Sequence, residues 1–320
     1  MRKGMVWCGV LLAVALVSGA ARGQAGQASQ NEAKSSARTG ILLMAHGGSK
    51  AWNGNVAAIA ADADKNQPTE VAFGMADRTT LQAGIDKLTA RGVTEVIAVP
   101  LFVSSHSSVI ECTKYLLGLR ATAPPDLADF ASMDMEHGHG DGGRGVASDA
   151  ASAEDKSLKT TPVKTNATIR MAPALDHHPI LADILTDRAT AISRNPGKEV
   201  VVLVAHGPND DAENDQWLAD LREVAKMVAA KKPFVRVEAT TVRDDAGAAV
   251  REAATQAFRQ LVSTADEQGY RVLIVPVLLS YGGIENGIRT RLDGLEHVMS
   301  PSGLLPDPRI VQWVDAGSAR

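Results

Sequence analysis

Two histidines in the first half of the chain follow short apolar runs and are candidate metal ligands. His46 lies in the segment ILLMAHGGS, residues 41–49, and His106 follows EVIAVPLFVS, residues 95–104. Neutral imidazole binds cobalt, iron, nickel and zinc, and a site with only two protein ligands leaves coordination positions open for chemistry. A single histidine after a strand is often a hydrogen-bonded turn residue. Two histidines at the ends of neighbouring strands favour a functional metal site.

The segment around His46 occurs a second time in the chain. Residues 201–208 read VVLVAHGP, so His206 corresponds to His46. Both copies have the branched, apolar composition of a strand buried on both faces, and both end in Ala-His-Gly. This internal repeat predicts two copies of one α/β unit.

Strands must alternate with helices if these histidines are to meet. Apolar runs occur in the first half of the chain and recur in the second half, and no tight hairpin signal lies between them. The strands expected from these runs are 41–45, 69–75, 95–104, 168–175, 200–205, 234–242, 270–280 and a closing strand at 309–313. That alternation predicts parallel sheets with right-handed crossovers. Open α/β sheets bind ligands beyond the carboxyl ends of their strands, where His46 and His106 are expected.

The first 39 residues are expected to lie outside the fold. Arg2 and Lys3 precede an apolar run and then small residues, so residues 1–24 are interpreted as a secretory signal peptide, with export to the periplasm. The apolar run is shorter than the roughly 20 residues of a spanning helix, so no stable membrane anchor is expected after cleavage. Residues 25–39, rich in Gln, Ala and Ser, are predicted to be a disordered spacer.

The repeat predicts an N-terminal domain over residues 40–195 and a C-terminal domain over residues 196–320. Within the first domain, residues 121–166 lack periodicity and are predicted to be a mobile insertion. His137 and His139 of this insertion, in HGHGDGG, could gather a metal ion or simply be solvated. We expect a monomer in which the two domains form an internal pseudo-dimer.

Three further positions are weaker candidate ligands. His177 and His178 precede a helix expected at 180–194; they could bind a metal as a pair, but the favoured interpretation has Asp176 capping the helix while the histidines line the site. In the second unit, Ile284 lies near the place of a second histidine, and Glu285 could supply a carboxylate. The second unit is therefore expected to have lost a metal site of its own.

Composition and missing motifs exclude several classes of function. The formal net charge is −4 and the sequence pI is near 6.1, so no nucleic-acid partner is expected. The sequence contains no Gly-x-Ser-x-Gly elbow and no Walker loop, so serine hydrolysis and phosphate chemistry have little support. Cys112 would be the only cysteine left after signal cleavage, so no disulfide forms within one mature chain.

Four segments together resemble the class II chelatases of the CbiX/SirB kind, namely LMAHGGS, VPLFV, APALDHHPIL and VVLVAHGPNDDAENDQWLADL. That resemblance implies insertion of cobalt or ferrous iron into sirohydrochlorin. It also implies two flavodoxin-like parallel-sheet domains facing a central cleft that holds the tetrapyrrole. Carried over to this sequence, the roles of metal ligand and proton acceptor fall on His46 and His106, and the divalent metal ion is a substrate.

Two questions stay open at the level of sequence. An exported, non-catalytic protein that binds a metal or haem would use the same histidines, and the signal peptide favours this alternative because tetrapyrrole synthesis is usually cytoplasmic. Arg243, Arg289 and Arg291 are candidate partners for the carboxylates of the tetrapyrrole, although the favoured interpretation makes them solvated helix residues.

Overall fold

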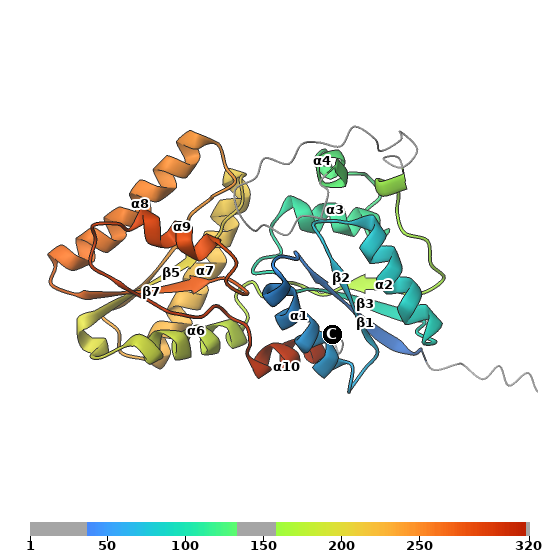
Figure 1. Ribbon diagram of the computed structural model, residues 1–320, viewed down its shortest axis with the longest axis horizontal. Helices are drawn as coiled ribbons and strands as arrows, with labels where there is room; N and C mark the ends of the chain where they lie inside the picture. The colour runs from blue at the N-terminus through green and yellow to red at the C-terminus, as the bar shows by residue number, and fades with distance from the viewer. Residues whose placement is uncertain (1–36, 133–157, 318–320) are drawn as a thin grey trace, which may run out of the picture. The chain divides into compact units, whose positions relative to one another are not determined.

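The computed structural model describes residues 37–132 and 158–317. The predicted signal peptide, most of the predicted spacer, and His137 and His139 lie outside the described residues. The described residues form two four-stranded parallel sheets flanked by helices (Figure 1). None of the helices in this part of the chain is long and apolar enough to cross a membrane.

The first sheet has the strand order β2-β1-β3-β4. Its strands are β1 (Thr39–Ala45), β2 (Thr69–Phe73), β3 (Glu95–Pro100) and β4 (Thr168–Met171). Strand β1 pairs in parallel with both β2 and β3, and Met44 is in register with Pro100. Because helices cover both faces of the sheet, Ile41, Leu42 and Leu43 are all fully buried. The strands before His46 and His106 are therefore neighbours.

The second sheet repeats this order as β6-β5-β7-β8. Its strands are β5 (Glu199–Ala205), β6 (Arg236–Thr241), β7 (Arg271–Val277) and β8 (Val298–Met299). Strand β5, which precedes His206, again pairs with the two strands that follow it in the chain. The prediction of two tandem parallel α/β units is confirmed.

The helices that connect the strands begin at side-chain caps. The described helices are α1 (Lys50–Ala63), α2 (Arg78–Ala90), α3 (Ser108–Leu116), α4 (Leu127–Ser132), α6 (Pro179–Ile192), α7 (Asp211–Lys231), α8 (Ala248–Glu267), α9 (Ile284–Arg291) and α10 (Pro308–Gly317). Ser49 accepts from the Trp52 N–H at 3.2 Å, and Asp210 accepts from the Glu213 N–H at 2.9 Å. Such caps satisfy backbone donors that a helix leaves unpaired at its start.

Two helices pack against the sheet of the other half of the chain. Helix α6 precedes the second sheet in the chain but packs on α7 and β7, and Lys231 Nζ lies 2.8 Å from Asp183 Oδ1. Helix α10, the last described helix, packs on α1 and β3, and Asn66 Nδ2 donates to Asp315 Oδ2 at 2.8 Å (Figure 1). Helix α6, which precedes residue 195, therefore packs with the second sheet, and α10, which follows it, packs with the first.

Two local predictions are wrong. The segment expected as a closing strand at 309–313 is part of helix α10, because Ile310, Trp313 and Val314 have the three-and-four spacing of a buried helix face. The fourth strand of the second sheet is instead the short β8. The predicted mobile insertion begins too early, because residues 127–132 form α4 and Leu127 is 3% exposed in the core of the first sheet.

Candidate metal site

His106 lies in the loop between β3 and α3. Its N–H donates to Ser104 Oγ at 3.1 Å, and the next residue, Ser107, caps α3 by accepting from the Ile110 N–H at 3.4 Å. Hydrogen bonds therefore fix the loop on both sides of His106, through Ser104 before it and through the start of α3 after it. The imidazole is 40% exposed, which leaves it accessible to a ligand.

Asp176 follows β4 and turns its carboxylate toward this loop. Its Oδ1 accepts from the Ser105 N–H at 2.6 Å, and its Oδ2 accepts from the Ser105 hydroxyl at 2.8 Å. The Ser105 hydroxyl also accepts from the Ala174 N–H at 2.8 Å. Asp176 has a φ of 45°, a left-handed conformation that aspartate tolerates better than most residues and that the surrounding bonds must hold in place.

The prediction that Asp176 caps the following helix is wrong. The N-cap of α6 is His178, whose Nδ1 accepts from the Ile180 N–H at 3.2 Å, and Pro179 is the first helical residue. An imidazole nitrogen can accept from a helical N–H as a carboxylate does, so the two alternatives cannot be separated from sequence. The carboxylate of Asp176 is free of the capping role and faces Ser105 instead.

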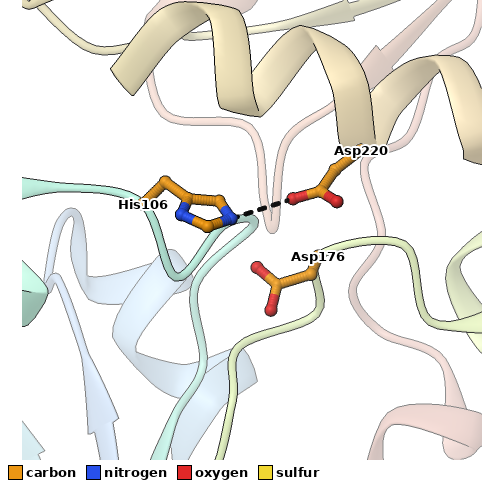
Figure 2. Close-up of side chains that lie close together, drawn as sticks. All are labelled: His106, Asp176 and Asp220. Atoms are coloured by element: carbon orange, nitrogen blue, oxygen red, sulfur yellow. Dashed lines mark ion pairs between the residues drawn. The ribbon is translucent and has the colours of Figure 1, made fainter. Parts of the chain in front are cut away.

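The carboxylate of Asp220, on α7, contacts two histidines of the first half of the chain, His106 and His177. Its Oδ2 lies 3.4 Å from His106 Nε2, and its Oδ1 lies 2.6 Å from His177 Nδ1 (Figure 2). One turn earlier on the same face of α7, Trp217 Nε1 donates to the His106 carbonyl at 2.6 Å. The Asp220 side chain is 15% exposed. Helix α7 therefore contacts both the backbone and the side chain of His106.

His106, Asp176 and Asp220 form the one group of three potential metal ligands found among residues 37–132 and 158–317. One ligand atom from each residue lies within 4.8 Å of the other two, and Figure 2 shows the three side chains directed toward a common point. Sequence reasoning missed Asp220 altogether and gave Asp176 a different role. Asp220 lies within the segment VVLVAHGPNDDAENDQWLADL, which carries the resemblance, but nothing in that segment singled it out as a ligand.

His46 lies at the start of the loop after β1. Its Nδ1 lies 2.8 Å from the carbonyl oxygen of Gly47, whose φ of 87° is the left-handed region that favours glycine. The next glycine, Gly48, donates its N–H to Asn53 Oδ1 at 2.8 Å. His46 is not a member of the group formed by His106. Convergence of His46 and His106 on one ion stays a prediction.

The weaker candidates of the second unit are engaged in local contacts. His206 Nε2 lies 3.4 Å from Asp245 Oδ2. Glu285 is 9% exposed, and its Oε2 accepts from the N–H groups of Gly282 and Gly283 at 3.1 and 2.8 Å. That carboxylate oxygen therefore holds the turn before α9.

Two of the arginines considered as tetrapyrrole partners are held in the second half. Arg243 is 8% exposed and donates to the carbonyls of Pro208 and Asn209 and to Asp211. Arg291 forms an ion pair with Asp244. The interpretation that these two are solvated helix residues is wrong. The guanidinium group of Arg243 binds loop carbonyls and a carboxylate, and that of Arg291 binds a carboxylate.

A second carboxylate on the same face of α7 has a perturbed pKa. Burial raises the pKa of Glu213, and the negative charges of Asp210, Asp126 and Glu111 raise it further, while His106 lowers it. The ionised form of Glu213 is therefore less favourable in the folded protein than in the unfolded chain.

Replacing Glu213 by Gln should stabilise the protein at neutral pH. A carboxyl whose pKa is raised by folding opposes folding once it ionises, so the gain should be present at pH 7 and vanish below about pH 4, where Glu213 is protonated in both states. Urea unfolding at several pH values measures this. Asp215→Asn, an exposed change on the same helix, is the control, and a Glu213→Gln gain that persists at low pH would contradict the explanation.

Comparisons with known proteins show one family match and several structures of the same fold. Residues 40–192 match the family model CbiX. No curated protein sequence matches the chain. The structure of SirB from Bacillus subtilis with Fe3+ is similar with a TM-score of 0.56 at 16% identity, covering 88% of this chain and 94% of that one.

A second solved structure shares the fold. DR2241 from Deinococcus radiodurans, described as a multi-domain protein with structural similarity to chelatases, matches with a TM-score of 0.51 at 17% identity; the match covers 88% of this chain and 55% of that protein. At such low identity these structures show the fold, while the family match rests on the sequence. The chain is thus similar to the CbiX family over residues 40–192 and shares the fold of the SirB structure.

Proposed function

We propose that the protein inserts a divalent metal ion, Co2+ or Fe2+, into a sirohydrochlorin-type tetrapyrrole. The observation that carries the proposal is the position of two histidines within the half that matches the CbiX family. His46 and His106 follow β1 and β3, which are adjacent strands of one parallel sheet. The carboxyl edge of such a sheet is where ligands bind in open α/β folds.

The reaction exchanges one divalent ion for the two protons of the pyrrole N–H groups. One histidine would hold the incoming ion and the other would share it or accept a pyrrole proton, and the assignment of these two roles to His46 and His106 is interchangeable. Only the neutral imidazole can do either task, so both residues must be unprotonated when the ion arrives. The ion and the tetrapyrrole are both substrates in this scheme.

An absorption assay tests the proposal. Purified protein is mixed with sirohydrochlorin and Co2+ or Fe2+, and the conversion of the tetrapyrrole spectrum is compared with the reaction without protein. Acceleration supports a chelatase. Binding of metal or haem without acceleration would instead support the alternative, an exported non-catalytic metal- or haem-binding protein.

We also propose that the protein is exported to the periplasm, as the amino-terminal pattern predicts. If so, the mature chain purified from a periplasmic fraction should begin near residues 21–26, after the small residues that end the apolar run. Amino-terminal sequencing measures this directly. A chain found in the cytoplasm with Met1 intact would contradict the export proposal and leave the chelatase proposal standing.

A further inference from the structure

A buried carboxylate oxygen beside His106 has no hydrogen-bond donor. Asp220 Oδ2 is buried and has no hydrogen-bond partner among the described residues, and His106 Nε2 lies 3.4 Å from it. A buried acceptor without a partner costs free energy, and an ionised one costs more. The other oxygen of the same carboxylate is satisfied by His177 Nδ1 at 2.6 Å. Oδ2 is therefore available as a ligand for a cation.

We propose that His106 Nε2, a carboxylate oxygen of Asp176 and Asp220 Oδ2 together bind one divalent transition-metal ion. One ligand atom from each of the three residues lies within 4.8 Å of the other two. Ligands about 2.0 to 2.2 Å from a metal lie at most about 4.4 Å apart, so small side-chain rotations complete the site. Two carboxylates neutralise the charge of the ion, and the mixed nitrogen and oxygen donors suit cobalt, iron, manganese or zinc.

The ligands are already oriented by a surrounding set of hydrogen bonds. Ser105 donates twice to the carboxylate of Asp176, and His177 holds the carboxylate of Asp220. Trp217 anchors the backbone of His106. Metal sites in proteins depend on such supporting contacts, which fix the direction of each ligand before the ion arrives. His177 is 62% exposed and acts here as a positioning residue.

This site takes ligands from both halves of the chain and shares only His106 with the predicted pair. The loop of β3 supplies His106, the segment after β4 supplies Asp176, and α7 supplies Asp220. Three protein ligands leave coordination positions open, as in sites that transfer or process what they bind. That the bound ion is the one inserted into the tetrapyrrole rests on the proposed function, whereas binding of the ion does not.

Titration with Co2+ alone tests the site without tetrapyrrole. The full chain is used with His137 and His139 replaced by alanine in every sample, so that the Gly-rich segment adds no binding. We expect one Co2+ per chain by calorimetry, with visible absorption bands of a nitrogen- and oxygen-ligated ion. Asp220→Asn and Asp176→Asn, which preserve side-chain shape, should each weaken binding at least about 10-fold, because each removes an anionic ligand.

Two control variants separate this site from its surroundings. Asp215→Asn removes an exposed charge from the same helix as Asp220. His297→Ala removes a histidine whose Nδ1 contacts the Leu295 carbonyl, outside the site. Both variants should bind Co2+ as the parent protein does. Far-UV circular dichroism without metal verifies that each variant is folded. Wild-type affinity in both folded Asp220→Asn and Asp176→Asn would overturn the proposal, and so would an equal loss of binding in the folded control Asp215→Asn.

The outcome also distinguishes failure of this site from failure of the proposed function. A protein that binds Co2+ through Asp220 and Asp176 but does not accelerate insertion would retain the site and refute the chelatase. A protein that accelerates insertion while both asparagine variants keep full Co2+ affinity would retain the chelatase and refute the site.

Discussion

Replacing His106 by alanine should slow metal insertion into sirohydrochlorin by about 100-fold or more. General acid-base catalysis by a positioned side chain contributes about 10²- to 10⁴-fold, and loss of a metal ligand adds to this. His106 is the histidine with the clearest support, because it faces Asp220 at 3.4 Å and belongs to the group that includes Asp176. Initial rates from the absorption change of the tetrapyrrole measure the effect.

The matched control for this experiment is His297→Ala. His297 Nδ1 contacts the carbonyl of Leu295 and lies in no candidate site, so its removal should leave the rate within about twofold. His46→Ala should resemble His106→Ala if the two share one ion or divide its tasks. A His106→Ala protein with the wild-type rate would show that His106 neither holds the ion nor accepts the proton.

Replacing Trp313 by alanine should lower the free energy of unfolding by about 3 to 5 kcal/mol, the usual cost of truncating a buried large aromatic side chain. Trp313 is 5% exposed on α10 and belongs to the same core cluster as Val56 and Ile59 of α1. The truncation would leave a cavity where the last described helix meets the first half. Urea unfolding followed by circular dichroism measures it.

Gln312→Ala provides the comparison on the same helix. Gln312 is exposed, so this change should alter stability by no more than about 0.5 kcal/mol. Because α10 packs on the first sheet and α6 on the second, the two halves should also unfold in one transition in the wild type. A loss below about 1 kcal/mol for Trp313→Ala would argue against the exchange of helices.

The fold was accessible from sequence wherever the pattern is local. Apolar runs such as residues 95–104 predict strands because a strand buried on both faces needs branched apolar residues throughout. The repeated Ala-His-Gly revealed two units, and the structure gives both sheets the same strand order. The wrong prediction at residues 309–313 concerned a short segment. Apolar residues such as Ile310 and Val314, four positions apart in so short a segment, fit either a strand or a helix until the packing partner is known.

The residues around His106 show why the site was only half visible. His106 follows a buried strand, and ligands bind at the carboxyl edge of a parallel sheet. The sequence alone therefore predicted His106 as a site residue. Asp176 was visible as a polar residue before a helix, but a capping role explained it equally well. The choice between the two depended on its hydrogen bonds to Ser105, which lies on another loop.

By itself the sequence determined the two α/β units, the strands that precede His46 and His106, and the similarity of residues 40–192 to the CbiX family, because each of these depends on residues close together in the chain. Only the tertiary structure decided that Asp220 faces His106, and that α6 and α10 pack on the sheet of the other half. These contacts join segments far apart in the chain, and their formation depends on how whole helices pack, which no local spacing of residues encodes.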